Sequence, residues 1–149
     1  MRKFSYGLLA FAVIAGSAAI ALAGPNPPMS ENGPKEVGTS FKFNPMNKSA
    51  QQGTVTMVAV GNKTRVTIAI TGEPNGAIEP SHVHTGNCAH PGAVIYPLTD
   101  VVAGHSVTLV NAPLSKVQVT GNSVNVHKSA AQLNLYMSCA NLGNPPSSM

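Results

Sequence analysis

Apolar and polar side chains alternate with a period of two along much of the chain. The runs 54–60 and 64–70 put Val and Ile on one face and Thr or Arg on the other, and Gly61-Asn62-Lys63 lies between them. This pattern predicts a β-hairpin. Further strands are expected at 78–84, 92–97, 105–110, 115–119, 122–127 and 132–138. Helical periodicity is nearly absent, with at most one turn near 129–131. About eight short strands separated by Gly and Pro predict an all-β sandwich or flattened barrel.

The first residues have the layout of a secretory signal peptide. Arg2 and Lys3 precede an uncharged, largely apolar stretch, and Ala21-Leu22-Ala23 has the small-x-small form of a cleavage site. A transmembrane anchor is the alternative, but Gly and Ser weaken the stretch as a permanent span. We therefore expect a signal peptide at 1–23 and a periplasmic or secreted protein, with no membrane attachment after cleavage.

The rest of the chain has the length of one domain. Residues 24–36 are rich in Pro, Gly and polar side chains and predict a disordered linker, and 143–149 predict a flexible tail. The β-sandwich is expected at 37–142. Loss of Arg2 and Lys3 removes half of the formal charge of +4, and no basic run is interleaved with aromatic residues. Nucleic acid is therefore an unsuitable partner, while the oligomeric state is left open.

Only two cysteines occur, Cys88 and Cys139. In an oxidising compartment a lone pair of this kind favours a disulfide over two buried thiols. A bond across so long a loop stabilises the fold by about 4 kcal/mol in the chain-entropy model.

Three histidines carry a geometric argument for a metal site. His82 and His84 are separated by one residue in an extended run, so their side chains share one face, roughly 7 Å apart, while Val83 points to the core. In the run 123–128, Val124 and Val126 share the core face and His127 lies on the other face with Asn125. If these strands are neighbours, three imidazoles converge, and imidazole binds both copper and zinc. A chance pair on the surface is the alternative for His82 and His84.

Two further histidines are less informative. His90 follows Cys88 by two residues, so a disulfide would hold its loop near His82 and His84. It is therefore a candidate fourth ligand, with a solvated loop residue as the alternative. His105 is most simply a surface residue.

The segments from Ser81 to Leu142 resemble the copper/zinc superoxide dismutase superfamily. Ser81-His82-Val83-His84, Gly86-Asn87-Cys88, the run 123–129 and the run 137–142 reproduce the order HxH, Cys, His, Cys over about half of the mature chain. The segment 81–142 is also similar to small exported bacterial relatives and to CHRD domains. The resemblance implies a Greek-key β-sandwich and one copper ion held by His82, His84 and His127.

The chain departs from this family in two places. It has no His-rich, Asp-containing loop for zinc, so a zinc ion is not expected. Tyr136 stands where the family has the arginine that guides superoxide to copper; Lys128 is the nearest remaining cation. We therefore expect a copper-binding exported protein, with an active copper-only superoxide dismutase as the first alternative. A β-sandwich that binds a partner without metal is the second, and whether the protein is an enzyme is left open.

Overall fold

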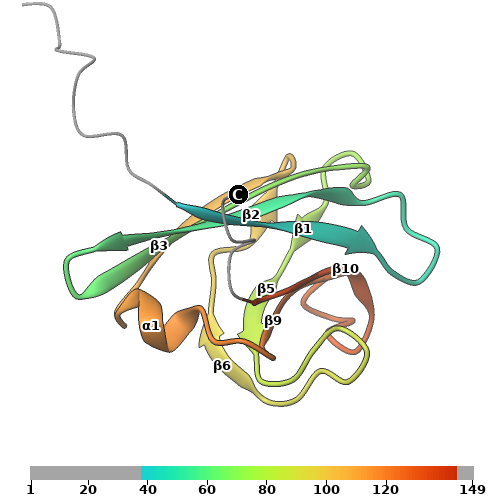
Figure 1. The fold of residues 1–149 in the computed structure, drawn as a ribbon. Coiled ribbons are helices and arrows are strands. Elements are labelled where there is room, and N and C mark those ends of the chain that lie inside the picture. The colour runs from blue at the N-terminus through green and yellow to red at the C-terminus, as the bar shows by residue number, and fades with distance from the viewer. Residues whose placement is uncertain (1–37, 144–149) are drawn as a thin grey trace, which may run out of the picture. The chain divides into compact units, whose positions relative to one another are not determined.

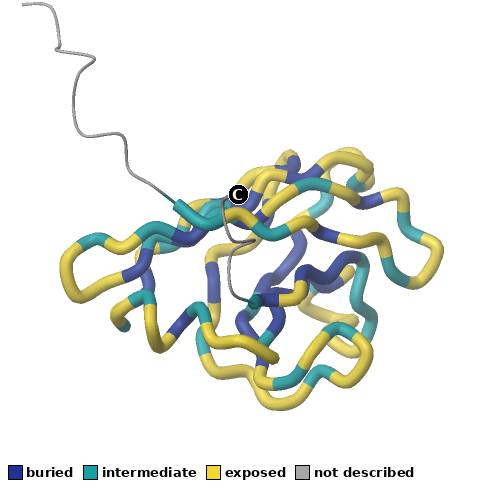
Figure 2. Tube along the Cα trace, viewed as in Figure 1, coloured by how far each residue is buried: buried dark blue, intermediate teal, exposed yellow. Residues whose placement is uncertain are grey.

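The fold is organised around a long β-hairpin. In the computed structural model, which describes residues 38–143, β2 (Gln52–Val60) and β3 (Lys63–Thr71) pair antiparallel from Gln52↔Thr71 to Val60↔Lys63. Buried residues alternate along both strands (Figure 2), because successive side chains of a strand point to opposite faces. The predicted hairpin is confirmed, while the predicted signal peptide and linker lie outside the described residues, as do residues 144–149 of the predicted tail.

The other elements extend this hairpin into a curled antiparallel sheet, drawn in Figure 1. They are β1 (Thr39–Pro45), β4 (Ile78–Glu79), β5 (Ser81–His84), β6 (Val94–Pro97), β7 (Val101–Val102), β8 (His105–Val110), α1 (Leu114–Val117), β9 (Ser123–His127) and β10 (Tyr136–Asn141). The strand order is β4-β7-β8-β3-β2-β1-β10-β9-β5-β6. The predicted all-β class is confirmed, with ten strands in place of about eight among the described residues.

The strand order contains a Greek key. Strands β1, β2 and β3 are consecutive antiparallel neighbours, and β10 returns from the far end of the chain to lie beside β1. The β1–β10 ladder is short, with Asn44↔Cys139 and Pro45↔Ser138 as its paired residues. The sheet curls there, and β5, β9 and β10 lie below β1–β3 in Figure 1. A buried cluster that includes Phe43, Ile68 and Val124 fills the space between the two halves.

The strand predicted at 78–84 is wrong as one element, because it is broken at Pro80. Glu79 pairs with Val101 of β7, whereas Ser81 pairs with Val126 of β9. Proline has no backbone N–H to donate to a ladder, so pairing changes partner at this residue. The chain passes there from one half of the curled sheet to the other.

The strand predicted at 115–119 is also wrong, because the segment forms the short helix α1. Pro113 precedes the helix, and the N–H of Lys116 donates to the Pro113 carbonyl over 2.8 Å. The fixed φ of proline suits a helix start. Within the helix, Leu114 packs on the core and Val117 is fully buried.

The last strand begins later than the predicted range 132–138. Two turns precede β10, closed by hydrogen bonds from Gln132 N to Ser129 O and from Leu135 N to Gln132 O. The single helical turn expected near 129–131 is therefore a β-turn. Strands β1 and β7 were not among those predicted, since β7 has only two residues and β1 has only one fully buried side chain, Phe43.

A buried polar network joins three segments beneath the sheet. The side chain of Gln51 donates to Glu79 over 2.6 Å, and Ser138 donates to Gln51 over 3.1 Å. Desolvation, and to a smaller extent the nearby Glu73, raise the pKa of Glu79. This network connects β4 and β10 to the residue preceding β2. In the described part of the chain, no helix is long and apolar enough to cross a membrane.

Candidate metal centre

The pairing of β5 with β9 brings the predicted histidines together. The register places His82 opposite Asn125, Val83 opposite Val124 and His84 opposite Ser123. Residues directly opposite in an antiparallel pair point to the same face. Val83 and Val124 are fully buried in the core, and His82, His84 and His127 therefore share the other face. The prediction that the two elements are neighbours with Val inside is confirmed.

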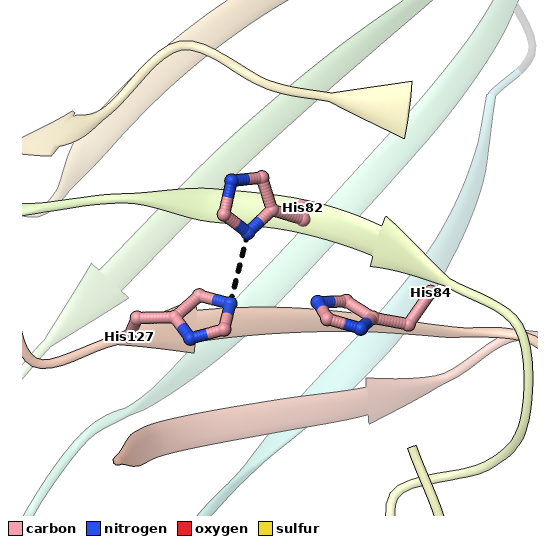
Figure 3. A group of neighbouring side chains, drawn as sticks. All are labelled: His82, His84 and His127. Atoms are coloured by element: carbon pink, nitrogen blue, oxygen red, sulfur yellow. Dashed lines mark hydrogen bonds between the residues drawn. The ribbon is translucent and has the colours of Figure 1, made fainter. Parts of the chain in front are cut away.

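The three imidazoles are close enough to bind one metal ion. One ring nitrogen of each lies within 4.8 Å of the others, and Figure 3 shows the rings directed toward one another. His82 Nδ1 is 2.9 Å from His127 Nε2. Imidazole nitrogens bind at about 2 Å, so two of them on one ion lie about 3.3–3.6 Å apart. To admit an ion, the His82–His127 contact has to open slightly and the proton shared between these nitrogens has to move to the other ring nitrogen of His82.

Backbone carbonyls orient two of the rings. His127 Nδ1 lies 2.5 Å from the Leu133 carbonyl oxygen, and His84 Nδ1 lies 3.0 Å from the Gly92 carbonyl oxygen. Because a carbonyl only accepts, each Nδ1 carries the proton and each Nε2 keeps its lone pair. His82 Nδ1–H then donates to His127 Nε2, whereas His84 Nε2 is buried without a partner. Such an unpaired buried acceptor is what a metal ligand looks like before it binds.

Burial favours the neutral form of His82 and His127, which is the form that binds metal. His84 and His127 are 3% and 2% exposed, and His82 is partly exposed. Desolvation lowers the pKa of His127 to about 4, although its hydrogen bond to Leu133 acts in the opposite direction. Desolvation also lowers the pKa of His82, with a smaller contribution from His84 and an opposing one from Asp100. Protons therefore compete weakly for the nitrogens of His82 and His127 near neutral pH.

A covalent brace holds the loop that orients His84. The loop 85–93 begins directly after His84, and Cys88 within it bonds to Cys139 of β10 with an S–S distance of 2.01 Å. Asn141 supports the same place, since its side-chain oxygen accepts from Cys88 N over 2.7 Å. The predicted disulfide is confirmed, and it indicates an oxidising compartment outside the cytoplasm. It also fixes the segment that carries the Gly92 carbonyl.

Tyr136 closes one side of the imidazole cluster. It pairs with His127 across β9 and β10, and its ring centre lies 4.9 Å from that of His127 and 6.0 Å from that of His84. The phenol ring thus shields the two most buried imidazoles, while His82 remains the partly exposed member. Solvent therefore reaches the imidazole cluster most directly past His82.

The remaining candidates lie apart from this cluster. His90 is exposed in the loop 85–93, where its N–H bonds to Asn87, and it is not one of the three grouped imidazoles. His105 is exposed at the start of β8, and Lys128 is exposed next to His127. Sequence reasoning did not find the Gly92 and Leu133 carbonyls, because a backbone acceptor leaves no residue-type signal.

Comparison with known proteins does not identify a relative: no family model, no curated protein and no solved structure matches the chain.

The lowered pKa of His127 predicts acid sensitivity of the metal-free protein. Between the ordinary value of 6.5 and the folded value of about 4, the unfolded chain binds a proton that the folded protein does not. The contribution of His127 to the free energy of unfolding is therefore fully present above pH 6.5. It falls by about 2–3 kcal/mol as the pH drops to 4. Imidazole proton shifts of the metal-free protein, followed by NMR, should place the His127 titration near pH 4, and a titration near 6.5 contradicts this.

The Cys88–Cys139 bond holds the loop whose Gly92 carbonyl orients His84, so breaking the bond should loosen that orientation. The double variant Cys88→Ser, Cys139→Ser should lose about 4 kcal/mol of unfolding free energy. At a temperature where it still folds, the Nδ1 proton of His84 should exchange with water faster than in the parent protein. The corresponding proton of His127, held by Leu133 outside the loop, serves as the internal control. Equal acceleration of both protons, or of neither, would show that the loop does not position His84.

Proposed function

We propose that this chain is an exported copper-binding protein with one copper ion held by His82, His84 and His127. The observation that carries the proposal is the convergence of three imidazoles, two of them almost fully buried, on one face of β5 and β9. The buried, unpartnered Nε2 of His84 lies in this group. It is an acceptor that an ion would satisfy.

The donor set favours copper over other ions. Within the described residues the grouped ligands are all imidazoles, with no carboxylate or thiolate among them. Hard ions such as Mg²⁺ and Ca²⁺ require oxygen ligands, and among divalent first-row ions a nitrogen site binds Cu²⁺ most tightly. Bound copper supplies one-electron redox chemistry.

The family resemblance supports the same assignment. The Cys88–Cys139 bond and the positions of His82, His84 and His127 follow the order that the resemblance to the copper/zinc superoxide dismutase superfamily implies. The Greek-key strand order is also the architecture that it implies. Export to the periplasm or the medium, through the signal peptide proposed at 1–23, fits a disulfide-bonded protein.

Copper titration of the purified protein tests the proposal. We expect one equivalent of Cu²⁺ with an electron paramagnetic resonance spectrum split by about three nitrogens. His84→Ala and His127→Ala should each lower the affinity by more than about 100-fold, since loss of an outer-shell partner alone costs 10–100-fold. His105→Ala is the matched control, because His105 is exposed on β8 and lies outside the group. Equal binding by the parent and the His84→Ala variant would refute the proposal.

A copper-only superoxide dismutase is the second candidate function. The partly exposed His82 leaves a route for a small anion, and the exposed Lys128 lies next to His127. Positive charge near a site speeds the approach of an anion. The copper-loaded protein should then dismutate superoxide faster than an equal amount of free copper salt. Lys128→Gln should slow the reaction and reduce its dependence on salt, with Lys63→Gln at the far hairpin turn as control. A rate no better than free copper eliminates this candidate.

A further inference from the structure

Asn125 lies on the same outer face of β5 and β9 as the three imidazoles. It lies opposite His82 of β5 and two residues before His127 on β9. His84 pairs with Ser123, two residues before Asn125, and is therefore diagonal to Asn125 across the two strands. On its other side it pairs with Cys139, the disulfide cysteine of β10. Opposite and alternate residues of a pleated sheet share a face. Asn125 therefore lies among all three candidate ligands and directly opposite the disulfide cysteine of β10.

The carboxamide of Asn125 is buried and incompletely bonded. The side chain is fully buried, its Nδ2 donates to Ser123 Oγ over 3.3 Å, and its Oδ1 has no hydrogen-bond partner. His84 Nε2 on the same face also lacks a partner. Two buried acceptors without donors on one polar face indicate that a positively charged group or a water belongs there.

Packing does not account for an asparagine at this position. Asn is disfavoured in strands, and a buried acceptor without a donor costs about 1–3 kcal/mol. At the neighbouring positions of β9 that only pack in the core, the residues are the apolar Val124 and Val126. Asn125 thus lowers fold stability, as polar groups of a functional site commonly do.

We propose that Asn125 is a specificity-determining residue of the metal centre that favours Cu²⁺ over Cu⁺. Its carboxamide oxygen adds an oxygen donor to three imidazole nitrogens, and four N and O donors suit Cu²⁺. Cu⁺ has no comparable preference for a hard oxygen donor, so three imidazoles serve it without Asn125. The inference rests on the copper site proposed above and goes beyond it, because it assigns a residue outside the three histidines.

The near-isosteric variant Asn125→Leu tests the assignment. We expect its Cu²⁺ affinity to fall by at least about 10-fold, because loss of an outer-shell partner alone already costs 10–100-fold. Its Cu⁺ affinity should change less than about 3-fold. Both affinities are measured by competition with chromophoric chelators, Cu⁺ under anaerobic, reducing conditions that leave the disulfide intact. The melting temperature of the metal-free variant should be unchanged or higher, because the variant removes an unsatisfied polar group.

The control and the parent protein separate the outcomes. Asn122→Leu changes a half-buried asparagine just before β9 and should leave both affinities unchanged. For Asn125→Leu, equal loss of both affinities, or loss of neither, overturns the assignment. A lower metal-free melting temperature with unchanged affinities also overturns it, since it would show a purely structural asparagine. If the parent protein binds copper no better than His84→Ala, the proposed function fails first, and the selectivity assignment fails with it.

Discussion

The antiparallel register of β5 against β9 is the constraint on which the candidate site depends. Val83 and Val124 face each other in the core, so His82 and Asn125 must face each other on the outer side. A slip of one residue would turn the imidazoles inward and the valines outward. The hydrophobic core thus determines on which face of the strands the polar site lies. Tight core packing is what holds the three ring nitrogens within reach of one ion.

The outer face of these two strands is also covered, so side chains on both faces of β9 are buried. The loop 85–93 and the Cys88–Cys139 bond lie over it, and all five residues of β9 are buried. Burial has two effects on the same imidazoles: it lowers the pKa of His127 and excludes water that would pair with His84 Nε2. The fold therefore keeps His127 neutral and leaves His84 Nε2 without a partner, at a cost in stability. Ligands held in place before binding are what a metal site requires.

Polar groups have different roles on the two sides of the β9–β10 layer. On the core side, Ser138, Gln51 and Glu79 are joined by hydrogen bonds and connect segments that are distant in sequence, while Glu79 Oε2 has no partner. On the outer side, Asn125 and His84 keep free acceptors. The two sides differ because the unpartnered acceptors of the outer side share one face with the grouped imidazoles.

The sequence alone determined the features that follow from local periodicity. Alternation of Val with His in the runs at 82–84 and 124–127 was enough to predict inward and outward faces, and the hairpin of β2 and β3 was predicted within two residues at each end. The pairing of Cys88 with Cys139 followed from there being only two cysteines. These features depend on neighbours a few residues apart, which a pattern records.

Only the tertiary structure decided the features that depend on partners distant in the chain. The break at Pro80 became visible because Glu79 and Ser81 pair with different strands, and Leu114–Val117 became a helix because Leu114 and Val117 both pack against the core. The Gly92 and Leu133 carbonyls set the imidazole protons through backbone atoms that every residue type possesses. Long-range pairing and backbone hydrogen bonding leave no signature in residue types. The sequence therefore indicated which side chains form the site, and the fold decided how they are oriented and how deeply they are buried.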